Sequence, residues 1–149
     1  MLKDELLDVH HTAVCVTDFE RARDFYVDFL GFELEGEADN RSESALGDVV
    51  GLKGATIRWA MLRRGSHCVE LFKYYQPEGN RTPREQCDLG YTHMAMRVRD
   101  VDAVFEQAVA AGYEPVSTPR VLRGGKTKVF YLREPEGAIT EFIQFNELG

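Results

Sequence analysis

The sequence predicts an α+β protein built from two copies of one module. The segments from His11 to Asp18 and from His93 to Asp100 each run from a histidine, through strand-like residues, to an aspartate that can cap a helix. Each copy continues through an amphipathic helix and later reaches a glutamate among apolar, strand-like residues. Because this order occurs twice, we expect a βαβββ repeat.

In the first copy, residues alternate from Val9 to Val16 as in a strand. Asp18 is the expected helix cap, and Gly31 is placed to end the helix in a left-handed turn. The apolar residues between them recur at helical spacing: Phe19, Ala22, Phe25, Tyr26, Phe29 and Leu30. Strands are expected near residues 32 to 36, 55 to 62 and 67 to 74. Residues 37 to 54 are rich in Gly, Ser and Asp and predict a loop that can hold a short helix.

The second copy predicts the same order of elements. A strand at 92 to 98, a helix at 101 to 111 and strands near 113 to 117, 126 to 132 and 138 to 145 are expected. Residues 76 to 90 are polar and contain Pro and Gly, as a linker should. One module with a single helix leaves a sheet face uncovered. We therefore expect one domain over residues 1 to 149, with repeats at about 7 to 75 and 90 to 146 and the site between them.

Composition limits the classes of function. With 149 residues, of which 44% are hydrophobic, the chain can bury the core of one ordinary domain. A net charge of -7 disfavours a nucleic-acid partner. An acidic start and the lack of a long apolar run disfavour a signal peptide and a membrane span, so we expect a soluble, cytoplasmic protein. Cys15, Cys68 and Cys87 lack CxxC spacing, which favours reduced, structural thiols over a disulfide framework or a cysteine zinc site.

The alternation selects two histidines as candidate metal ligands. His11 lies beside Ala13 on the strand face opposite the bulky residues, and His93 has the same place in its copy. His10 and His67 are expected to support the site or to lie at the surface. A lone histidine in a strand is usually structural, but the match between the two copies favours a metal role.

Two glutamates complete the candidate site. Glu70 and Glu141 lie in apolar strands, where a carboxylate must find a cation or become neutral unless it faces water. Two imidazoles and two carboxylates leave open positions on a six-coordinate divalent ion and suit Zn, Mn, Co, Ni or Fe(II). Trp59 is expected to contact a substrate in the pocket, although aromatic residues in strands more often belong to the core.

Three segments carry a family resemblance. The stretches from His11 to Asp18, from Asp24 to Phe32 and from Arg133 to Glu141 resemble the vicinal oxygen chelate superfamily, which includes glyoxalases, bleomycin-resistance proteins and extradiol dioxygenases. The resemblance implies paired βαβββ modules in a cupped, barrel-like mixed sheet around a divalent metal. It also implies a homodimer, a small-molecule substrate with vicinal oxygens, and metal ligands at His11, Glu70, His93 and Glu141.

The four positions narrow the reaction within that superfamily. Drug-binding members typically lack the four ligands, which favours an enzyme. Extradiol dioxygenases and fosfomycin-type thiol transferases use three ligands, and Glu70 would crowd that chemistry. Glyoxalase I and the epimerases remain, and both move a proton next to a carbonyl. Residues 49 to 62 and 69 to 75 are most similar to epimerase-like members, among them epimerases of keto-cyclitols such as 2-epi-5-epi-valiolone.

The resemblance also implies a mechanism. A metal would stabilise the enolate formed when the proton alpha to the carbonyl leaves. Epimerisation removes a proton from one face and returns it to the other, which predicts Glu141 as one acid/base and Glu70 as its partner. One departure is that methylmalonyl-CoA epimerases often carry Gln at the position of Glu70, and their additional catalytic Glu has no secure counterpart here. A glyoxalase I-type lyase (lactoylglutathione lyase) and a metal-free small-molecule binding or resistance protein stay open as alternatives.

Overall fold

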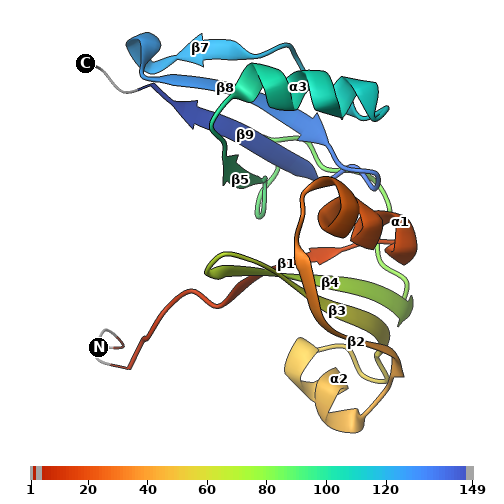
Figure 1. Cartoon of the computed structure of the whole chain (residues 1–149). Coiled ribbons are helices and arrows are strands. Elements are labelled where there is room, and N and C mark those ends of the chain that lie inside the picture. Colours follow the sequence, from red (N-terminus) through yellow and green to blue (C-terminus); the bar gives the residue numbers. More distant parts are fainter. Residues whose placement is uncertain (1, 3–4, 147–149) are drawn as a thin grey trace. The chain divides into compact units, whose positions relative to one another are not determined.

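The computed structural model describes residue 2 and residues 5 to 146, and it confirms the α+β class (Figure 1). The chain divides into two compact units, one up to Arg81 and one from Thr82 onward. Each unit contains one open mixed sheet, so neither sheet closes on itself as a barrel. The assembly of both sheets around one metal, within a single domain, stays a prediction. Among the described helices, none has the length and apolar character needed to cross a membrane.

The first unit is built on a four-stranded sheet with the order β1-β4-β3-β2. Its strands are β1 (His11–Cys15), β2 (Glu33–Arg41), β3 (Thr56–Arg64) and β4 (His67–Gln76). β1 runs parallel to β4, whereas β3 is antiparallel to both of its neighbours. The mixed sheet places the start of β1 beside β4, where the first candidate histidine and glutamate lie.

The predicted helix of the first unit is confirmed, with one change. α1 (Phe19–Asp24) begins after Asp18, whose Oδ1 accepts a hydrogen bond from the Arg21 amide at 3.2 Å. It then widens into a π-helix, η2 (Phe25–Phe29), in which the Leu30 amide donates to the carbonyl of Phe25 at 3.0 Å. The expected apolar face is buried at Phe19, Ala22, Phe25 and Tyr26. Gly31, at φ +70°, then turns the chain away in the left-handed conformation.

Residues 37 to 54 differ from the predicted loop. β2 continues to Arg41, and α2 (Ser44–Val50) follows as the short helix. The polar sequence of this strand has little intrinsic strand preference, so its pairing with β3 decides its conformation. The pairing of β2 with β3 is irregular, with register shifts at two places.

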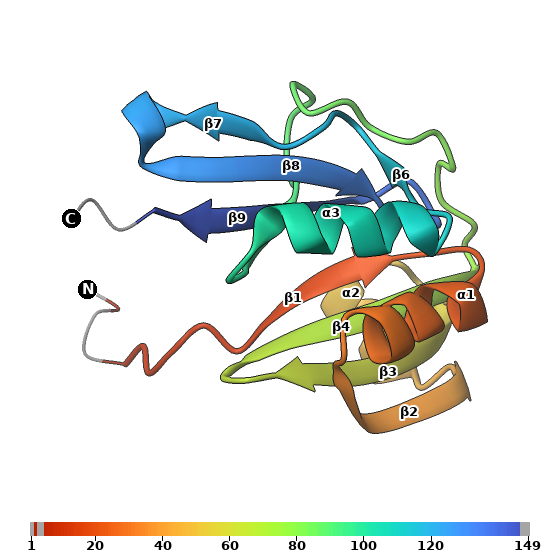
Figure 2. The same ribbon diagram turned by 45° about the horizontal axis from the view of Figure 1, so that its top comes forward.

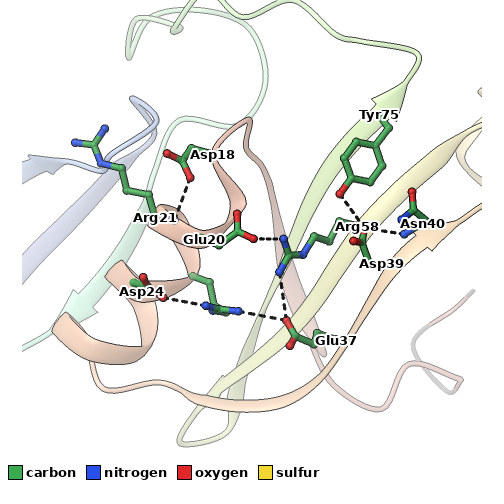
Figure 3. A network of polar contacts seen from close by, with 10 residues as sticks. Asp18, Glu20, Arg21, Asp24, Glu37, Asp39, Asn40, Arg58 and Tyr75 are labelled. Carbon is green, nitrogen blue, oxygen red and sulfur yellow. Dashed lines mark hydrogen bonds and ion pairs between the residues drawn. The ribbon is translucent and has the colours of Figure 1, made fainter.

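A polar network holds the helix of the first unit to its sheet (Figure 3). The Arg58 guanidinium on β3 bonds Glu20 of α1 and lies 4.0 Å from a carboxylate oxygen of Glu37 on β2. It also lies 4.3 Å from the centre of the Phe19 ring. Exposed ion pairs contribute about 0–1 kcal/mol each, so this network orients α1 more than it stabilises the unit.

The second unit has the strand order β5-β9-β8-β6, with β7 also paired to β8. The strands are β5 (Met94–Arg97), β6 (Glu114–Pro115), β7 (Arg120–Leu122), β8 (Thr127–Arg133) and β9 (Ile139–Phe145). α3 (Val101–Ala110) packs against β8 and β9 on one face of this sheet (Figures 1 and 2). Phe105 of α3 meets Phe130 of β8 edge to face, at 5.4 Å between ring centres.

The outer edge of this sheet is shorter than predicted. The strand expected at 113 to 117 is reduced to the two residues of β6, and β7 takes up pairing further along β8. Pro115 and Pro119 provide no backbone N–H, so this stretch cannot form a continuous ladder. A 3₁₀ turn, η3 (Arg123–Gly125), then leads into β8.

Candidate functional site

The first unit brings His11 and Glu70 together. In the parallel β1–β4 pair, Ala13 lies opposite Glu70, so the histidine two residues before Ala13 shares its face and is its diagonal neighbour. The His11 Nε2 to Glu70 Oε2 distance is 3.0 Å. Val14, on the opposite face of β1, is buried, as the alternation predicts. The backbone register therefore places the imidazole beside the carboxylate.

The second unit repeats this arrangement with His93 and Glu141. Ala95 lies opposite Glu141 in the parallel β5–β9 pair, and His93 again lies two residues earlier. The His93 Nε2 to Glu141 Oε2 distance is 2.9 Å. The Glu70 and Glu141 side chains are 16% and 15% exposed, so each carboxylate is largely withdrawn from water to the same degree. The repeat seen in the sequence is thus a repeat of side-chain geometry.

The four candidates form two pairs, one in each unit. Within the described part of the chain, no group of three or more His, Cys, Asp or Glu side chains lies together as a cation site. Cys15, Cys68 and Cys87 are free thiols. Each unit therefore provides one imidazole nitrogen and one carboxylate oxygen.

Trp59 has a polar role that its position in a strand does not reveal. Its indole N–H, on β3, donates a hydrogen bond to Oε1 of Glu70. The other carboxylate oxygen, Oε2, is the atom that faces His11. Because each oxygen has its own partner, the plane of this carboxylate is fixed. The predicted contact between Trp59 and a substrate stays a prediction.

The two other histidines contact residues of β1 or its start. His10 Nδ1 lies 2.9 Å from His11 Nδ1, and the two rings meet edge to face. His67 Nε2 lies 3.0 Å from Oγ1 of Thr12, on the face away from the Glu70 pair. His10 thus touches a candidate ligand directly, whereas His67 does not.

His93 is held on both sides of its ring. Its Nδ1 lies 2.9 Å from Gln86 Oε1 and 3.0 Å from Thr92 Oγ1. On the other side the Tyr131 ring lies 4.8 Å away, centre to centre, with its hydroxyl 3.5 Å from Nε2. Sequence reasoning missed Gln86 because it falls in the segment expected to be only a linker, where a glutamine carries no distinguishing pattern.

Two phenols near the carboxylates stay protonated. Burial, followed by the negative charge of Glu141, raises the pKa of Tyr131 above its ordinary value. Burial, followed by the charges of Cys15 and Glu70, raises the pKa of Tyr74 in the same direction. Each hydroxyl therefore remains available as a hydrogen-bond donor at neutral pH.

The donor set fits a divalent cation. Nitrogen and oxygen donors about 2.1 Å from an ion, at right angles to each other, lie about 3 Å apart. The His11–Glu70 and His93–Glu141 distances, 3.0 and 2.9 Å, are compatible with that separation and equally with a direct hydrogen bond within each pair. Imidazole and carboxylate ligands suit Zn, Mn, Co, Ni and Fe(II). Each pair could therefore provide two donors to a metal of the kind that the resemblance implies.

Comparison with known proteins identifies the family. The model of the Glyoxalase/Bleomycin resistance protein/Dioxygenase superfamily matches residues 8 to 142. The chain belongs to this superfamily, which confirms the resemblance seen in the sequence.

Individual relatives include enzymes of two kinds. A 2-epi-5-epi-valiolone epimerase from an Actinomyces species is 34% identical over 145 residues, covering 91% of this chain and 78% of that protein. The lactoylglutathione lyase of Haemophilus influenzae is 24% identical over 138 residues, covering 93% of each. The crystal structure of a glyoxalase family protein from Bacillus cereus matches with a TM-score of 0.83 at 24% identity, over 97% of this chain and 98% of its own. That last likeness shows the shared fold.

Proposed function

We propose that this protein is a divalent-metal-dependent epimerase that moves a proton at the carbon alpha to a carbonyl. Its substrate would be a small hydroxylated ketone, a keto-cyclitol such as 2-epi-5-epi-valiolone. The observation that carries the proposal is the His–Glu pair that recurs in both units with one strand register and nearly equal distances. A structural ion pair would explain either His–Glu contact by itself. It would not explain why the same pair occurs at the matching position of both units.

The residues that would hold the metal are His11 and Glu70 from the first unit and His93 and Glu141 from the second. When bound, a divalent ion would polarise the carbonyl of the substrate and stabilise the negative charge that forms on its oxygen. The largely buried carboxylates support this assignment, because two such charges without a cation cost free energy in the folded state.

The two glutamates would act as the acid and the base. Glu70 is fixed by the Trp59 indole, which leaves its Oε2 toward the histidine. Among the described residues, Glu141 has no comparable donor on its carboxylate, so it can turn more easily between its histidine and a substrate proton. We assign Glu141 as the base that removes the proton and Glu70 as the partner that returns one.

The neighbouring side chains suit a substrate rich in hydroxyl groups. The phenols of Tyr74 and Tyr131 stay neutral and can donate hydrogen bonds to substrate oxygens. The Trp59 ring would offer an apolar surface to the carbon skeleton while its N–H is used by Glu70. The relative that acts on 2-epi-5-epi-valiolone supports the same substrate class.

A glyoxalase I-type lyase is the second candidate. It is supported by the lactoylglutathione lyase relative, and it would need the same proton removal next to a carbonyl. A metal-free binding or resistance protein is the third candidate.

We also expect a cytoplasmic homodimer, because the family resemblance implies one. Light scattering of the purified protein tests the dimer.

The test is proton exchange at the alpha carbon. The metal-loaded protein is incubated in D₂O with 2-epi-5-epi-valiolone, and in parallel with the glutathione hemithioacetal of methylglyoxal, and products are followed by NMR. We expect deuterium at the alpha carbon and the inverted epimer with the ketone only. Glu141→Gln should slow exchange by about 10²–10⁴-fold. The exposed Glu106→Gln on α3 should not change it. Turnover of the hemithioacetal alone, or full turnover by Glu141→Gln, would contradict this assignment.

A further inference from the structure

The segment before β5 forms a turn that holds the Gln86 side chain beside the ring of His93. The Asp88 amide donates to the carbonyl of Glu85 at 3.1 Å, and the Glu85 amide donates to Oδ2 of Asp88 at 2.8 Å. The Arg84 guanidinium donates to the carbonyl of Leu89 at 2.6 Å. These bonds close a turn around Gln86 and hold its side chain toward β5.

The two ends of the Gln86 carboxamide are distinguishable by their partners. Its Nε2 donates to the backbone carbonyl of Thr92 at 3.0 Å. A carbonyl oxygen only accepts hydrogen bonds, so the NH₂ group must be at that end. The oxygen, Oε1, is therefore the atom that lies 2.9 Å from His93 Nδ1.

This orientation shows that Nδ1 of His93 carries a proton. Because Gln86 Oε1 also only accepts, Nδ1 must be the donor. The hydroxyl of Thr92, 3.0 Å from the same nitrogen, can accept as well. Nε2 lies 2.9 Å from the Glu141 carboxylate, which also only accepts, so this nitrogen carries either a second proton or, once a metal is bound, the lone pair that binds the metal.

We propose that Gln86 is a positioning residue that holds His93 in the Nδ1–H tautomer and so commits its Nε2 to a divalent metal. This inference rests on the proposed metal site, but the hydrogen bond itself can be tested with or without metal. Partners of this kind, on the far nitrogen of a metal-binding histidine, typically change metal affinity by about 10–100-fold.

The test compares two substitutions of Gln86 with a control on α3. Gln86→Met removes the acceptor at similar length, Gln86→Glu keeps an acceptor oxygen, and Gln107→Met changes an exposed glutamine of the same unit. Zinc affinity is measured against a competing chelator. We expect about 10–100-fold weaker binding for Gln86→Met, a smaller loss for Gln86→Glu, which keeps the acceptor but loses the donor to the Thr92 carbonyl, and a value near wild type for Gln107→Met. Equal affinity in Gln86→Met and wild type would overturn the proposal.

A second readout reports the tautomer directly. Long-range ¹H–¹⁵N NMR of labelled protein identifies the protonated ring nitrogen, and the His93 signals are assigned with His93→Gln. We expect a slowly exchanging Nδ1 proton in wild type and Gln86→Glu that is lost in Gln86→Met. If wild type binds no metal, the proposed function fails, and the same spectra of metal-free protein still decide the role of Gln86. Indistinguishable Nδ1 protonation in Gln86→Met and wild type would contradict it.

Discussion

The two units hold the same His–Glu pair but fix different members of it. In the first, the Trp59 indole holds the carboxylate of Glu70; in the second, the Gln86 carboxamide holds the imidazole of His93. The strand register that sets each pair is the same in both units. The repeated backbone therefore sets the distance within each pair, while side chains that are not repeated decide which member is rigid.

His11 in the first pair and Glu141 in the second are the less constrained members. Nδ1 of His11 contacts Nδ1 of His10, which can donate or accept a hydrogen bond. The tautomer of His11 is therefore set less firmly than that of His93, whose Nδ1 contacts an oxygen that only accepts. Glu141 has Tyr131 beside it across β8 and β9 but lacks a donor like the indole of Trp59 among the described residues. If the two glutamates act as the proposed acid and base, the less constrained carboxylate of Glu141 suits the base that removes the proton.

The largest expected effect tests whether the units are energetically coupled. Leu71 on β4 and Leu132 on β8 are both fully buried, so each Leu→Ala change should cost about 2–5 kcal/mol of unfolding free energy. Trp59 is the only tryptophan, and it reports on the first unit. If the units form one domain, Leu132→Ala in the second unit shifts the urea transition followed by Trp59 fluorescence. A shift seen by circular dichroism but absent from the fluorescence would show independent units.

The next largest effect is on metal affinity and concerns the aromatic neighbours of the two His–Glu pairs, Trp59 and Tyr131. Trp59→Phe removes the N–H that holds Glu70, and we expect metal binding to weaken by about 10–100-fold. Tyr131→Phe removes a hydroxyl 3.5 Å from His93 Nε2, which is too long for a strong bond, and should change binding little. Chelator competition with both variants measures the difference. Equal losses of metal affinity in the two variants would show that the aromatic neighbours do not differ in the way described.

A smaller effect is expected at the helix caps. Asp100 Oδ1 accepts from the amides of Asp102 and Ala103, both at 3.0 Å, whereas among the described residues Asp18 accepts from the Arg21 amide alone, at 3.2 Å. Asp100→Ala should therefore cost about 1 kcal/mol of unfolding free energy and Asp18→Ala less. Urea denaturation gives both values. The reverse order would mean that packing of the helices, more than capping, sets their starts.

At neutral pH the smallest effect comes from Tyr91 of the second unit, because its influence on stability changes only in alkaline solution. Partial burial of Tyr91, which is 43% exposed, followed by the charge of Glu134, raises the pKa of Tyr91 to about 12 from the value of about 10 in an unfolded chain. The neutral phenol is favoured in the folded state, so its contribution is full below pH 10 and is lost as the pH rises toward 12. Tyr91→Phe should reduce the fall in unfolding free energy over that window. An unchanged slope would show that Tyr91 titrates normally.

The sequence was sufficient for the parts of the fold that depend on local pattern. Alternation identified the faces of β1 and β5, and Asp18 and Gly31 marked the ends of the first helix. The extension of β2 to Arg41 was not predicted, because pairing with β3 overrides a polar sequence with weak strand preference.

The candidate site was predictable only in part, for a related reason. Repeat matching selected the two His–Glu pairs, which need only strand register to meet. The Trp59 bond to Glu70 depends on how side chains turn across neighbouring strands, and the Gln86 bond to His93 depends on a turn of irregular backbone. Neither arrangement follows from residue spacing.

The most direct test of a metal site formed by both His–Glu pairs is the metal content of the protein purified without chelator. Elemental analysis would compare wild type with His11→Ala from the first unit, Glu141→Ala from the second, and His67→Ala as a control histidine outside the pairs. We expect about one divalent ion per chain in wild type and His67→Ala, and none in the other two variants. No uptake of Zn, Mn, Co, Ni or Fe(II) by wild type, or a full complement of metal in His11→Ala and Glu141→Ala, would contradict a site built from both units.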